Sequence, residues 1–196
     1  MAIIVAGTAD ARARHRVALS AVGMTLGYTI PALIAILGFA LEGPDAIVWG
    51  RAILAGLVAA FVMWVVMFLG RMVGITRIDL LDLLGSLVSR PHTSTSHTLG
   101  FIIHEIDGAL LAIAGAYGAL LVGWQFDWAS GLLWGVLLWA LSLLVMTSVG
   151  GVHPAMRRGQ EEDPGAAAIN MGPMTPWGAL MAHAVYGLVL GGLYIV

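Results

Sequence analysis

The feature that most constrains this chain is a series of five long apolar stretches separated by short polar segments. Each approaches or exceeds the roughly 20 residues that a helix needs to cross a bilayer. The stretches cover residues 17–41, 46–73, 99–124, 129–149 and 176–196. The sequence therefore predicts an all-α integral membrane bundle of five transmembrane helices, which forms a single domain over residues 1–196.

Composition excludes several classes of function. Of the 196 residues, 60% are hydrophobic and only 10% are charged, which is typical of a protein that contacts the lipid bilayer. The net charge of −2 and the lack of a basic patch argue against nucleic acid as a partner. The chain has no cysteine, so disulfides, thiolate metal sites and thioether-linked haem are excluded.

No arrangement of residues typical of an enzyme is present. The serines have no histidine and acid at suggestive positions, and there is no phosphate-binding Gly-Lys loop. The run from His104 to Gly108, His-Glu-Ile-Asp-Gly, has glycine where the zincin motif needs a second histidine. The sequence therefore favours a protein that is not an enzyme.

The arginines predict the orientation of the chain. With the N-terminus in the cytoplasm, eight of the nine basic residues lie on the inner side and only Arg51 lies outside. The eight are Arg12, Arg14, Arg16, Arg71, Arg77, Arg90, Arg157 and Arg158. We therefore expect the C-terminus to lie outside.

The segment between the second and third spans predicts an amphipathic helix over residues 77–90. Asp79, Asp82, Ser86 and Ser89 recur at steps of three and four residues, with leucines on the other side. We expect this helix to lie at the inner interface with its acidic face in water, as a connector below the bundle. For His92, which follows Pro91, an ordinary turn is favoured over a metal site.

Spans two and three resemble spans four and five as pairs. Each pair has an apolar helix, an inner connection and a helix with His-x-x-x-Gly, which is His104 to Gly108 in one and His183 to Gly187 in the other. Both histidine helices run from inside to outside. This pattern predicts a parallel two-helix repeat, with the first span at the periphery.

Several segments are similar to a family of small prokaryotic polytopic membrane proteins that has no assigned activity. They are Gly70-Arg-Met-Val-Gly-Ile-Thr-Arg-Ile-Asp79 to Leu84-Gly85, Leu99-Gly-Phe-Ile-Ile-His104, His153-Pro154, Asn170 to Gly178, and His183 to Tyr194. The resemblance covers roughly residues 46–196. It implies the architecture and a prokaryotic cytoplasmic (inner) membrane, but no activity.

The histidines of the two His-x-x-x-Gly motifs are the candidate functional residues, because an ionisable group inside lipid costs free energy unless it has a polar or charged partner. His104 and His183 lie at similar depths, in the cytoplasmic third of the membrane. Asp107 shares the face of His104, and Tyr186 that of His183. Glu105 projects about 100° away from His104.

Three hypotheses for function follow from these residues. In one, His104 and His183 bind haem b, with Gly108 and Gly187 leaving room for the macrocycle, or His104, Asp107 and His183 bind a divalent metal. In another, His104, Glu105, Asp107 and His183 form the path of a proton-coupled transporter or channel.

The preferred hypothesis is structural and requires no cofactor. The small-residue stripes Gly108–Ala112–Gly115–Ala119 and Gly187–Gly191 are typical of faces that pack transmembrane helices. The histidines would then only form hydrogen bonds between helices. This pattern favours a non-catalytic subunit or scaffold of a larger membrane complex, such as an energy-transducing one, or a self-associating protein.

Overall fold

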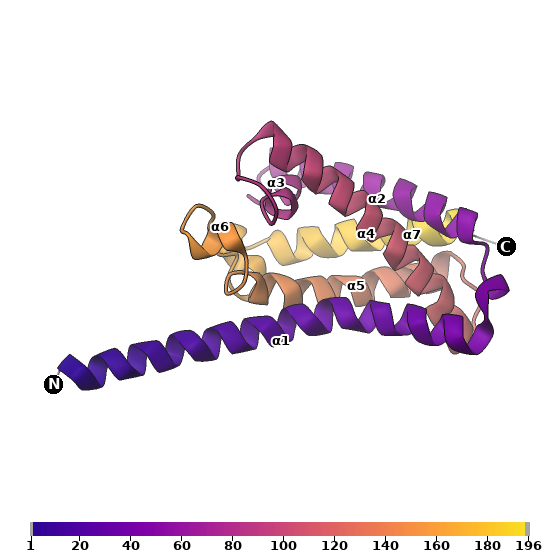
Figure 1. The fold of residues 1–196 in the computed structure, drawn as a ribbon. Coiled ribbons are helices and arrows are strands. Elements are labelled where there is room, and N and C mark those ends of the chain that lie inside the picture. Colours follow the sequence, from indigo (N-terminus) through magenta and orange to yellow (C-terminus); the bar gives the residue numbers. More distant parts are fainter. Residues whose placement is uncertain (1, 195–196) are drawn as a thin grey trace.

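The computed structural model describes residues 2–194, with side chains described from Ala21 onward. Every regular element in this part of the chain is a helix. Five of the helices are long and apolar enough to cross a membrane. Figure 1 shows them lying together as a bundle. The predicted all-α bundle of five transmembrane helices is therefore confirmed, and it fits a multi-pass membrane protein in contact with lipid.

The long helices follow the predicted spans closely. They are α1 (Ala2–Glu42), α2 (Trp49–Met72), α4 (Ser94–Leu121), α5 (Trp128–Val149) and α7 (Thr175–Tyr194). Helix α4 starts before the expected residue 99 because Thr93 and Ser96 form a capping box at its start. Helix α1 starts well before residue 17, and its N-terminal part projects beyond the other helices in Figure 1. The side chains of Arg12, Arg14 and Arg16 lie outside the described residues.

The short elements connect the long helices at the two ends of the bundle (Figure 1). They are η1 (Pro44–Ala46), α3 (Leu80–Gly85), α6 (Pro154–Arg157) and η2 (Ala166–Met171). We call the end that holds residues 73–93 and 150–174 the connector end. Its two connections touch, since the Arg77 N–H donates to the Met171 carbonyl oxygen at 2.7 Å. The Thr175 hydroxyl is also 3.1 Å from the Thr76 hydroxyl.

The packing of the helices matches the two expected pairs. Helix α2 packs against α4, α5 packs against α7, and α2 joins the pairs through α7. Helix α1 lies against α4 and α5, and its membrane span has the smallest buried share of the five, 17%. The expected parallel relation between the two pairs stays a prediction.

Glycines allow the helices of each pair to approach closely. A Cβ on Gly131 of α5 would overlap the Gly187 carbonyl oxygen of α7, and a Cβ on Gly187 would overlap that of Gly131. On α4, a Cβ on Gly108 would overlap the Ala60 side chain of α2. Backbone contact of this kind is how small residues stabilise helix pairs in lipid, where the hydrophobic effect does not drive helices together.

Helix α3 differs from the predicted interfacial helix in length and in orientation. Its helical residues are Leu80–Gly85 only, within the expected 77–90. The prediction that Asp82 and Ser86 face water is wrong, because their exposures are 2% and 1%. Asp82 accepts a hydrogen bond from Ser96 at the start of α4, and the Ser86 hydroxyl donates to the Leu83 carbonyl oxygen within α3. The buried polar groups of α3 thus form hydrogen bonds within the protein and not to solvent.

Candidate functional site

His104 is fixed between two helices in the interior of the bundle. Its exposure is 7%, and its Nε2 lies 3.0 Å from the Ala60 carbonyl oxygen of α2. A carbonyl oxygen can only accept, so Nε2 carries the hydrogen of this bond. In the neutral ring, Nδ1 of His104 is then the nitrogen with an available lone pair.

His183 is held by its own helix and has the opposite arrangement. Its Nδ1 lies 2.8 Å from the Ala179 carbonyl oxygen, one turn earlier in α7, and therefore donates to it. The lone pair of the neutral ring is on Nε2. The imidazoles of His104 and His183 are near enough to interact electrostatically.

Both histidines line one partly open cavity of about 910 Å³ between the helices of the bundle. All five long helices contribute to its wall, and most of the lining residues are apolar. The polar or ionisable lining residues are Tyr28, Thr76, His104, Asp107, Ser142, Thr175, His183 and Tyr186. Both imidazoles therefore face the same cavity, with His104 buried and His183 half-buried.

Asp107 and Tyr186 complete the polar part of the cavity wall. Tyr186 is buried, and its hydroxyl donates to the Gly108 carbonyl oxygen at 2.7 Å, which joins α7 to α4. Asp107 is near enough to both Tyr186 and Tyr28 to interact with them electrostatically. The cavity thus brings together His104, Asp107, His183 and Tyr186, which the sequence had placed on two helices.

The other residues predicted for this site are placed differently. Gly187 is outside the cavity wall and packs against α5, whereas Gly108 both lines the cavity and packs against α2. Glu105 is also outside the wall, and its Oε1 is buried without a hydrogen-bond partner. In the part of the chain that the structure describes, the ligand atoms of His104, Asp107 and His183 do not all lie within 4.8 Å of one another.

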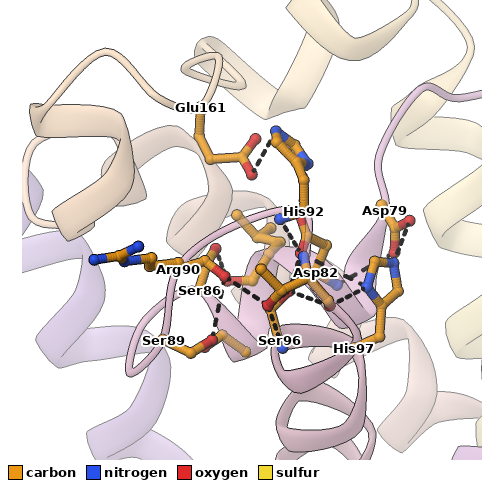
Figure 2. A network of polar contacts seen from close by, with 12 residues as sticks. Asp79, Asp82, Ser86, Ser89, Arg90, His92, Ser96, His97 and Glu161 are labelled. Atoms are coloured by element: carbon orange, nitrogen blue, oxygen red, sulfur yellow. Dashed lines mark hydrogen bonds and ion pairs between the residues drawn. The ribbon is translucent and has the colours of Figure 1, made fainter.

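A second polar cluster lies at the connector end, and sequence reasoning assigned it only to a turn and a wet helix face (Figure 2). Asp79 is the N-cap of α3 and accepts from the Asp82 N–H at 3.2 Å. His97 Nε2 is 3.1 Å from Asp79, and Arg71 pairs with the same carboxylate. Partial burial opposes ionisation of Asp79, but these three partners together lower its pKa below its ordinary value.

The same cluster contains Asp82, His92 and Glu161, which meet from three separate segments (Figure 2). No spacing in the sequence joins residues 82, 92 and 161, so periodicity had no means of grouping them. The available signal was Asp82 itself, an aspartate among leucines in a short apolar helix. A buried carboxylate costs free energy unless it is paired or hydrogen-bonded, so such a residue indicates a buried partner.

Comparisons with protein families, with curated proteins and with solved structures give no match to this chain. The resemblance to a family of small prokaryotic membrane proteins stays a prediction.

Proposed function

We propose that this membrane protein binds an organic cofactor or ligand in the cavity of its bundle, with His183 and His104 as the contacting groups. The observation that carries the proposal is the cavity of about 910 Å³ lined by both imidazoles. Its size falls in the range of about 300–1,000 Å³ found for ligand pockets, which are mostly apolar with a few placed polar groups.

The free nitrogens favour His183 as the principal ligand. Metal-binding histidines usually donate their other N–H to a carbonyl or carboxylate, which fixes the ring and its tautomer. Both cavity histidines do so, but only His183 leaves the outer nitrogen, Nε2, available. Haem b, which His183 would hold through Nε2, is the first candidate for the bound group.

A single metal ion held by His104, Asp107 and His183 is supported less well. An ion would need the three ligand atoms to converge at bond lengths of about 2.0–2.2 Å. The three residues share a wall but do not form a converging set within 4.8 Å. An organic group can span such a separation, whereas an ion would require the helices to shift.

The other two hypotheses have less support from the geometry. If the histidines only bridged helices in a scaffold, we would expect side chains to fill the space around them. Both histidines instead line a cavity. A proton or ion path needs a polar route, and the lining is mostly apolar, with Glu105 outside it. Assembly with other membrane subunits or with a second copy remains compatible with a bound ligand.

The arginine distribution supports a location for this site. We place the N-terminus in the cytoplasm, the C-terminus outside and the chain in a prokaryotic cytoplasmic membrane. The connector end then faces the cytoplasm. Fusion of a reporter active only in the cytoplasm to residue 43 or to residue 160 tests this, and activity is expected only at residue 160.

The ligand proposal is tested by an ultraviolet-visible spectrum, metal analysis and mass spectrometry of extracts from the detergent-purified protein. The variants are His183→Ala and His104→Ala, with His97→Ala as the control. His97 is also on α4 but does not line the cavity. We expect a Soret band, or another stoichiometric organic ligand, that His183→Ala loses and His97→Ala keeps. A folded, colourless and ligand-free wild type would instead support the packing role.

A further inference from the structure

The connector end holds three potential metal ligands that the proposed cavity function does not use. Asp82 comes from α3, His92 from the segment before α4, and Glu161 from the segment between α6 and η2. One ligand atom from each lies within 4.8 Å of the others. Figure 2 shows the Glu161 carboxylate and the His92 ring turned toward one another, above Asp82.

Asp82 is held rigidly in the interior. Its side chain is 3% exposed. Oδ1 accepts from the His92 backbone N–H at 2.8 Å and from the Ser96 hydroxyl. Oδ2 is 2.9 Å from His92 Nδ1. Fixing a ligand by hydrogen bonds to its carboxylate is the usual support of a metal site, because it orients the oxygen before the ion arrives.

Glu161 has an oxygen without a hydrogen-bond partner. Its Oε1 is screened from solvent and accepts no hydrogen bond. The group beside it is His92 Nε2, at 3.5 Å. Burial raises the pKa of the Glu161 carboxyl, the adjacent Asp82 raises it further, and His92 partly opposes this. Two arginines at this end are used elsewhere, since Arg71 pairs with Asp79 and Arg77 pairs with Glu162.

Asp82 is buried and Glu161 is partly buried, and two such neighbouring carboxylates repel one another unless a positive group lies between them. We propose that Asp82, His92 and Glu161 bind one divalent transition-metal ion of the zinc class at the connector end. One imidazole nitrogen and two carboxylates are a donor set that suits Zn²⁺, Mn²⁺ or Fe²⁺. The His92 side chain is 69% exposed, so it can turn to complete the site and gives the ion access from solvent.

Such an ion would join the two connections of the bundle. Asp82 and His92 belong to the connection between α2 and α4, and Glu161 belongs to that between α5 and α7. The ion would therefore hold the ends of both helix pairs together, in addition to the Thr76–Thr175 contact between the same two connections. The site is separate from the cavity, because Asp82, His92 and Glu161 are not among the cavity-lining residues.

The test uses the full chain, purified in detergent and stripped of metal with a chelator. Zn²⁺ and Mn²⁺ are titrated by calorimetry, with Mg²⁺ for comparison, into the wild type and into Glu161→Gln and His92→Ala. Glu162→Gln is the matched control, because it removes the adjacent carboxylate, which pairs with Arg77 instead. We expect one ion per chain, at least tenfold weaker binding in Glu161→Gln and His92→Ala, and unchanged binding in Glu162→Gln.

Thermal unfolding gives a second readout of the same proposal. In the wild type the metal should raise the unfolding temperature by roughly 5 °C at about 100 times the dissociation constant. The rise should vanish in Glu161→Gln, whose helical content shows that it folds, and persist in His183→Ala. Saturable binding that survives Glu161→Gln would assign the ion to surface histidines and overturn the proposal. The absence of saturable binding by the wild type would also overturn it.

Discussion

The two cavity histidines differ in which ring nitrogen is available and in what their hydrogen bonds join. The bond from His104 crosses from α4 to Ala60 of α2, whereas the bond from His183 returns to Ala179 on the same helix. His104 therefore contributes to the assembly of the bundle, and His183 is the more available for a ligand. The sequence identified both residues but could not assign the His104 bond, because that bond depends on how α2 meets α4.

This difference predicts that the two histidines contribute unequally to stability. His104→Ala should lower the free energy of unfolding by about 1 kcal/mol more than His183→Ala in ligand-free protein, since it removes an interhelical hydrogen bond. Reversible unfolding of both variants in mixed detergent measures the difference. Equal losses would mean that the His104–Ala60 bond does not support helix packing.

The Glu161 carboxyl predicts a pH dependence of the metal-free protein. Because its pKa is raised above the ordinary 4.5, the folded chain binds this proton more tightly than the unfolded chain. Its favourable contribution is complete below pH 4.5 and is lost as the pH rises through the folded pKa. Asp79, Asp82 and His92 are its charged neighbours, and all three are present in both the wild type and the variant.

Metal-free Glu161→Gln should therefore be more stable than the metal-free wild type near pH 8, and the difference should disappear below pH 4.5. Unfolding temperatures across this range, with Glu162→Gln as the control, provide the measurement. A variant that is less stable than the wild type at pH 8 would show that the carboxylate is well satisfied without an ion.

Among the elements, α5 and α7 depend on glycine for their close contact. Gly187 has the Gly131 carbonyl oxygen where its side chain would be, whereas a Cβ on Gly192, on the same helix, meets nothing within 4 Å. Gly187→Ala should thus destabilise the protein by about 1–3 kcal/mol, the usual cost of overpacking. Gly192→Ala should be neutral or stabilise it by up to about 1 kcal/mol. Unfolding of the two variants in detergent tests this, and similar values for both would contradict the close contact.

The element that sequence reasoning described least well is α3. The spacing of its polar residues correctly indicates a helix with one polar face. The prediction that this face contacts water is wrong. The start of α4 provides partners for that face, because Ser96 donates to Asp82. Gly85 and Gly100 also let the two backbones touch. Periodicity shows that a helix has two unlike faces but does not show what covers either one.

For the molecule as a whole, the number and order of the helices could be predicted because length and hydropathy are local properties of the chain. The small-residue stripes also indicated correctly which faces pack. The cavity could not be predicted, since it is the space that five helices leave between them. The connector-end cluster could not be predicted either, because Glu161 meets Asp82 and His92 only after both helix pairs have assembled.

The central claim is that the cavity beside His104 and His183 holds a bound organic group, and native mass spectrometry of the gently solubilised protein tests it most directly. Leu141 of α5 lines the cavity, whereas Leu133 of the same helix is 56% exposed and lies outside the wall. We predict a mass excess in the wild type that Leu141→Trp abolishes by filling the cavity and Leu133→Trp retains. A folded wild type at its bare mass, or a ligand that survives Leu141→Trp, would contradict the account.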